Sequence, residues 1–71
     1  MRRELNALYD AVNKAHYRYA YHLANLLYLN ERNPIRKDQL EYLCFLLDVL
    51  QRKNSQLALK KVYEILEEVR P

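Results

Sequence analysis

The chain contains no glycine and only two prolines, Pro34 and Pro71, in 71 residues. Glycine supplies the positive φ angles of tight hairpin turns and lets backbone approach a bound phosphate closely. Its absence therefore argues against hairpin-rich and phosphate-loop folds and favours helices. A chain of this length makes one small domain, which hides only about 60% of its unfolded surface. We expect a single helical domain over residues 1–71.

Apolar residues recur at alternating steps of three and four in the first part of the chain, which is helical periodicity. The repeat consists of Leu5, Leu8, Val12, Ala15, Tyr19, Leu26 and Leu29, with His22 in the same register. This pattern predicts one continuous helix over about residues 3–30. Tyrosines at alternate positions 17, 19 and 21 also suit a strand, but the flanking segments 13–15 and 23–25 are poor turns.

Cap and breaker residues predict two further helices. Pro34 disfavours helix in the residue before it and suits the first turn of a new helix, with Asn33 as its cap. This helix runs over about residues 34–52. Either Asn54 or Ser55 caps the last helix, over about residues 55–69. The predicted fold is all-α, a three-helix antiparallel bundle with an overlong N-terminal helix.

The helical positions of apolar side chains predict what each helix buries. In the middle helix the centre of the apolar face is Leu40, Leu43, Leu46, Leu47 and Leu50, extended by Ile35, Tyr42 and Val49. In the last helix the face is Ala58, Leu59, Val62, Ile65, Leu66 and Val69. The second half of the first helix is apolar on two opposed sides, so we expect both other helices to flank it.

The unequal lengths of the predicted helices suggest an interaction surface. At about 1.5 Å per residue the first helix measures roughly 42 Å and the second roughly 27 Å, so the N-terminal part projects beyond its neighbours. We expect this arm to pack on a second copy of the chain or on another protein. The predicted partner-binding residues are Leu5, Leu8, Tyr9 and Val12, with Tyr17, Tyr21 and Tyr28 as a second candidate surface. In the alternative, the helix begins near Asn6 and the preceding residues fray.

The charge balance permits a second function. Twelve basic and nine acidic residues give a net charge of +3, which allows acidic partners without requiring them. Possible nucleic-acid contacts are Arg3, Lys14, Arg18 and Arg32 on the first helix, although a solvated helix face is the preferred explanation of these residues. Glutamates 64, 67 and 68 argue against the last helix as a recognition helix, because they would repel phosphate.

No catalytic or metal-binding motif is present. His16 and His22 lie about 120° apart around a helix, and Cys44 has no CxxC or HxxxH partner. We therefore expect no enzyme activity, no cofactor, no metal and no small-molecule substrate; an enzyme subunit completed by another chain ranks third. If a dimer brought two His22 side chains together, their contact would depend on pH.

Cysteine usage and hydropathy predict the compartment. Cys44 is the only cysteine, and no apolar segment of signal-peptide type follows Met1-Arg2-Arg3-Glu4. Arg18, His22 and Asn25 interrupt the longest apolar segment, which is too short to span a membrane. An amphipathic membrane-surface helix ranks last, since the other helices account for the apolar faces. The sequence predicts a cytoplasmic, regulatory protein-interaction module that forms a homodimer.

Overall fold

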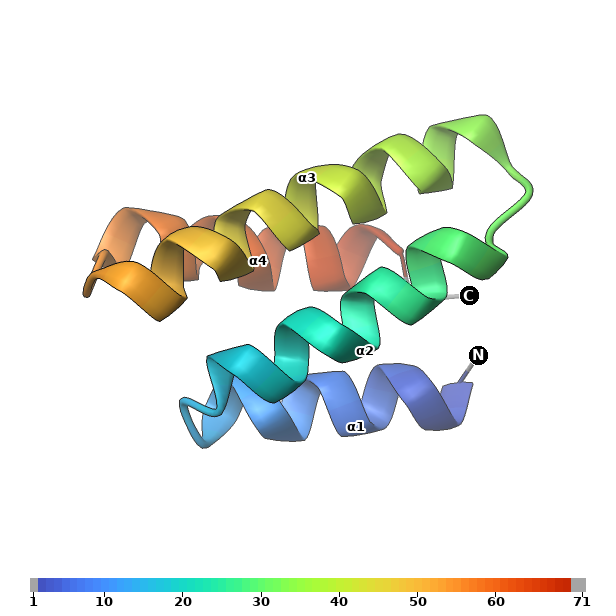
Figure 1. Ribbon diagram of the computed structural model, residues 1–71. Coiled ribbons are helices and arrows are strands. Elements are labelled where there is room, and N and C mark those ends of the chain that lie inside the picture. The colour runs from blue at the N-terminus through green and yellow to red at the C-terminus, as the bar shows by residue number, and fades with distance from the viewer. Residues whose placement is uncertain (1, 70–71) are drawn as a thin grey trace.

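The computed structural model describes residues 2–69, which form four helices joined by short connections (Figure 1). They are α1 (Arg2–Asn13), α2 (Tyr17–Asn30), α3 (Pro34–Arg52) and α4 (Gln56–Glu68). No strand occurs within these residues, so the predicted all-α class is confirmed. The predicted three-helix bundle is corrected to a four-helix arrangement.

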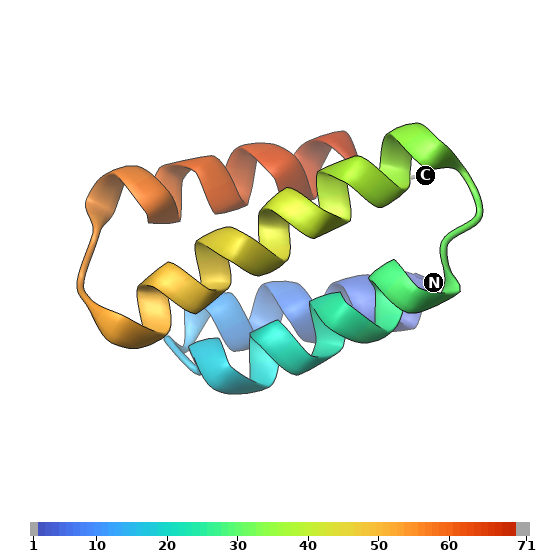
Figure 2. The same ribbon diagram turned by 45° about the horizontal axis from the view of Figure 1, so that its top comes forward.

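Consecutive helices run antiparallel. The start of α1, the α2–α3 connection and the end of α4 lie at one end of the molecule (Figure 2). The α1–α2 turn and the α3–α4 connection lie at the other end. α3 packs on both α2 and α4, and α1 packs on α2. Side-chain hydrogen bonds link α1 to α4: the Tyr9 hydroxyl donates to Glu67 Oε1 at 2.9 Å, and the Tyr63 hydroxyl donates to Asn13 Oδ1.

The predicted continuous helix over residues 3–30 is wrong, because the chain reverses at residues 14–16. A straight helix of that length would measure roughly 42 Å at about 1.5 Å per residue. The longest extent of the molecule is 31 Å. The projecting arm therefore does not exist in this structure, and α1 folds back along α2.

Backbone hydrogen bonds explain how α1 ends without glycine or proline. The His16 N–H donates to the Ala11 carbonyl at 2.8 Å and the Ala15 N–H donates to the Val12 carbonyl at 3.0 Å. These two bonds form the Schellman C-cap, in which the residue after the cap takes the left-handed conformation. That residue is Ala15, with φ of 60°. Glycine usually occupies this position, so its absence from the sequence concealed the turn.

The predicted caps of the later helices are confirmed. The Asn33 side chain accepts hydrogen bonds from the backbone N–H groups of Ile35 at 2.9 Å and Arg36 at 3.3 Å, and Pro34 opens the first turn of α3. Of the two candidates for the last cap, Ser55 is the residue used: its hydroxyl accepts from the Ala58 N–H at 3.2 Å. α3 and α4 accordingly occupy almost the residues predicted.

All four helices contribute to one hydrophobic core. The five predicted leucines of α3 are buried, and so are most of the predicted positions of α4. Ile35 and Tyr42, which were predicted to extend the buried face of α3, are exposed. They are exposed because, among residues 2–69, no helix packs over that side of α3.

Candidate protein-interaction surface

The predicted N-terminal partner surface lies inside the molecule. Leu5, Leu8 and Val12 are only 4%, 0% and 2% exposed. Tyr9 is half-buried against the core and its hydroxyl is bonded to Glu67 of α4. The expectation that nothing in the monomer covers these side chains is wrong, because the turn at residues 14–16 places α1 on the core.

The second predicted surface, formed by three tyrosines of α2, is also largely covered. Tyr17, Tyr21 and Tyr28 are half-buried and pack against the core. Lys37 of α3 lies over the Tyr28 ring, with Nζ 4.4 Å from the ring centroid, and donates a hydrogen bond to the Tyr28 carbonyl at 3.2 Å. This cation–π contact fastens the C-terminal end of α2 to the start of α3.

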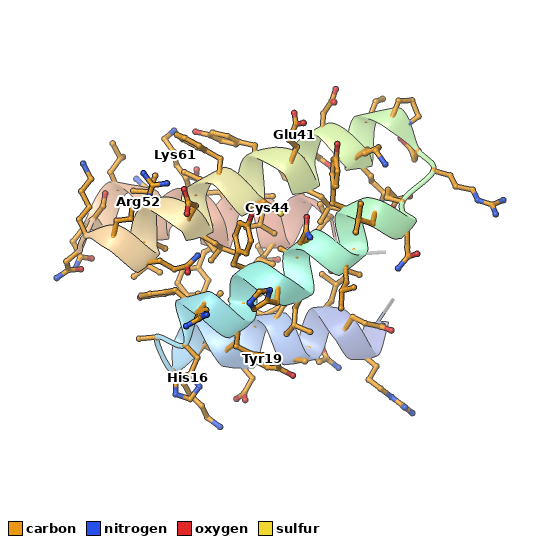
Figure 3. All side chains as sticks on the ribbon, viewed as in Figure 1. His16, Tyr19, Glu41, Cys44, Arg52 and Lys61 are labelled. Carbon is orange, nitrogen blue, oxygen red and sulfur yellow. The ribbon has the colours of Figure 1, made fainter. Side chains whose placement is uncertain are left out.

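An apolar face of α2 that was predicted to be covered by the other helices is instead exposed. Tyr19, Leu26 and Leu29 are 56%, 55% and 62% exposed, and His22 is exposed between them. Their spacing of three, four and three residues places all four side chains on one face of the helix. We call these four residues the outer α2 face. Figure 3 shows Tyr19 on the opposite side of the molecule from Glu41 and Lys61.

The signal for the outer α2 face was already present in the sequence. Tyr19, His22, Leu26 and Leu29 continue the register of Leu5, Leu8 and Val12. On one continuous helix both sets would share one face and the same neighbours. The reversal at Ala15 separates them, so that the first set is buried and the second faces solvent.

The charged side chain that α2 itself places beside the outer α2 face is basic. α2 has 14 residues, none of them acidic, and the exposed Arg18 lies beside Tyr19 and His22. At the other end of the face, Asn30 of the same helix and Glu4 of α1 lie beside Leu26. The end of the face at Arg18 is therefore basic, and it complements acidic groups of a partner.

Other exposed apolar residues lie on α3 and α4. The rings of Tyr42 and Phe45 stack with their centroids 6.3 Å apart and their planes at 13°. Charged residues of both signs interrupt this surface: Arg52 pairs with Asp48 at 2.6 Å on the same helix, and Glu41 is exposed. By contrast, the four positions of the outer α2 face contain no aspartate, glutamate, lysine or arginine.

The four basic residues proposed for nucleic-acid contact are divided between two helices and the connections that follow them. Arg18 lies in the first turn of α2 and Arg32 follows the end of that helix. Lys14 pairs with Asp10 at 3.2 Å, and Arg3 lies on α1. Nucleic-acid binding stays a prediction: an electrophoretic shift that is absent even at low salt would remove it.

The single cysteine has little nucleophilic character. Burial, followed by repulsion from the Glu41 carboxylate, raises the pKa of the Cys44 thiol to about 11. The thiolate is the nucleophilic form, so this thiol is almost entirely protonated at neutral pH. His16 lies at the α1–α2 turn, far from Cys44 on α3, and residues 2–69 contain no group of three or more possible metal ligands (Figure 3).

Comparisons with known proteins give no relative for this chain. No family model matches it, and neither a curated protein nor a solved structure does. Over residues 2–69, no helix is both long enough and apolar enough to cross a bilayer.

Proposed function

We propose that this chain is a non-enzymatic protein-interaction module whose outer α2 face binds an amphipathic helix of another protein. The observation that carries the proposal is the alignment of Tyr19, Leu26 and Leu29, each more than half exposed, on one face of α2. Scattered single exposed apolar residues are normal on protein surfaces, whereas an aligned series marks an interaction site. Helix-in-groove recognition uses anchors at this spacing.

The chemistry of the outer α2 face defines the partner. Leu26 and Leu29 offer aliphatic contact area, and Tyr19 adds a ring whose hydroxyl can stay hydrated. Since more than half of each side chain is still exposed, completing its burial contributes roughly 1 kcal/mol per residue before association entropy is paid. Arg18 favours acidic groups beside the partner's apolar stripe. These modest terms support a reversible interaction.

The experiment uses a matched pair of helical peptides as probes. Both carry leucines at the spacing of the outer α2 face; one has glutamates and the other lysines on the flanks. Titration into the ¹⁵N-labelled protein, followed by amide chemical shifts, should map binding of the acidic peptide to residues 19–29. The lysine-flanked peptide should bind at least several-fold more weakly, because Arg18 and the net charge of +3 repel it.

Two single variants provide the controls. Leu26→Glu places a charge at the centre of the outer α2 face and should weaken the acidic peptide by about tenfold or more. Leu57→Glu changes a leucine that is 66% exposed on α4 and should leave binding unchanged. Shifts centred on α3 and α4, or equal binding by wild type and Leu26→Glu, would contradict the proposal.

A further inference from the structure

The turn between α1 and α2 has the features of a hinge that can open. It consists of exposed Lys14, Ala15 and His16. Ala15 has a φ of 60°, in the left-handed region that disfavours every residue with a Cβ atom. The His16 side chain makes no capping hydrogen bond to the start of α2. The closed turn is therefore strained at one residue and weakly capped at the next.

The same residues are compatible with a continuous helix. Alanine has the highest helix propensity of all residues, lysine is also favourable, and neither glycine nor proline occurs between residues 1 and 33. The first amide groups of α2 have no acceptor within their own helix and would gain carbonyl partners if the helix continued from α1. Opening the turn thus relieves the Ala15 strain and adds helical hydrogen bonds.

The antiparallel hairpin determines where an opened α1 can bind. When the hinge straightens, α1 leaves its place on the core and exposes Leu5, Leu8 and Val12, which are buried in the closed chain. Two opened chains can lie antiparallel, so that each α1 runs beside the α2 of the other chain. Each α1 then meets the same surface that it covers in its own chain.

We propose that a second copy of this chain is a binding partner and that the two copies exchange α1 through the hinge at Ala15. The exchanged dimer keeps the contacts of the closed chain and makes them between chains: Tyr9 to Glu67 and Tyr63 to Asn13. Exchange of an identical element is a low-cost route to dimers, and short strained hinges favour it. This inference rests on the hinge at Ala15 and on the contacts of α1, and it does not require the outer α2 face to bind a peptide.

The test is a pair of substitutions at Ala15 with opposite effects. Ala15→Gly relieves the left-handed strain of the closed turn and destabilises a continuous helix. Because the dimer contains two hinges, the substitution acts twice in each dimer. We expect the dimer dissociation constant to rise by about 100-fold or more. Ala15→Val disfavours the left-handed turn further, because a β-branched residue is a strong outlier there, and should increase the dimer population.

The experiment measures the mass of the assembly and determines whether the contacts of α1 are made within a chain or between chains. Each protein is refolded from denaturant at high concentration, because exchange requires α1 to leave the core, and its mass is followed by sedimentation equilibrium on dilution. In a mixture of isotope-labelled and unlabelled chains, filtered nuclear Overhauser spectra should show the Tyr63 ring near Asn13 of the other chain. The result supporting exchange is a dimer with this contact between chains, favoured by Ala15→Val and suppressed by Ala15→Gly.

Two results would overturn the exchange. One is a dimer in which Tyr63 and Asn13 remain in contact only within a chain. The other is a monomer at every concentration for wild type and for Ala15→Val. Ala15→Gly separates this proposal from the peptide-binding function, since it should suppress the exchanged dimer and leave binding of the acidic peptide to the monomer unchanged. Loss of both properties in that variant would contradict the independence of the two proposals.

Discussion

Replacing Ala15 by glycine gives a direct test of the reversal between α1 and α2. Ala15 has a φ of 60° and caps α1 through the hydrogen bonds of His16 and Ala15 to Ala11 and Val12. This conformation destabilises an L-residue with a Cβ atom by about 1–2 kcal/mol. Glycine avoids that cost but loses about 0.4–1 kcal/mol through the greater freedom of the unfolded chain.

The difference between these terms predicts that Ala15→Gly stabilises the monomer by about 0.5–1 kcal/mol. For a domain of this size the midpoint of thermal unfolding should rise by roughly 2–8 °C. Urea denaturation followed by circular dichroism, at protein concentrations low enough to keep the chain monomeric, measures the same change as a higher denaturation midpoint with an unchanged slope.

The sign of the effect distinguishes the turn from a continuous helix. Glycine in a helix interior costs about 1 kcal/mol relative to alanine, so the substitution would destabilise a chain that is helical through residue 15. Ala7→Gly, within α1, provides the matched control and should destabilise by about that amount or slightly more. If Ala15→Gly destabilised the protein as Ala7→Gly does, the Schellman turn and the proposed hinge would both be wrong.

Two further predictions concern the core and the thiol. Leu8 is fully buried, so Leu8→Ala should lower the free energy of unfolding by about 2–5 kcal/mol. Leu29 is exposed, so Leu29→Ala should change the free energy of unfolding by less than about 0.5 kcal/mol. Equal effects of the two substitutions in urea denaturation would refute the burial of α1. The pKa of Cys44 is about 11, whereas an ordinary cysteine has a value of 9.0, so at neutral pH Cys44 should have about 100-fold less thiolate than an unperturbed cysteine. The greater nucleophilicity of a more basic thiolate partly compensates for this loss of reactivity. Its alkylation by iodoacetamide should therefore be about tenfold slower in the native protein than in urea and should accelerate up to pH 11, and a native rate equal to the unfolded rate would refute the burial effect.

The later part of the chain was predictable because its signals are local. Asn33, Pro34 and Ser55 act on backbone groups within three residues of themselves, so their roles as caps follow from the sequence alone. The leucines of α3 recur at helical spacing and are buried as expected. Only Ile35 and Tyr42 were misplaced, since their exposure depends on how many other helices surround α3.

The candidate interaction surface was not predictable in the same way. The repeat from Leu5 to Leu29 shows that its members share a register, and the sequence determines that much. Which members face solvent depends on where the helix stops. With the break at residues 14–16, Leu8 is buried and Leu26 is exposed, which is the reverse of what the continuous helix implied.

The amino-acid sequence by itself determined that the chain is helical, where α3 and α4 begin and which of their faces are apolar, because propensity, capping and periodicity act over a few residues. The tertiary structure alone decided the reversal at Ala15. Local propensity favours helix there, and the left-handed residue costs about 1–2 kcal/mol. Burying Leu5, Leu8 and Val12 contributes roughly 1.5–3 kcal/mol for each side chain, so packing outweighs the local preference and breaks the helix.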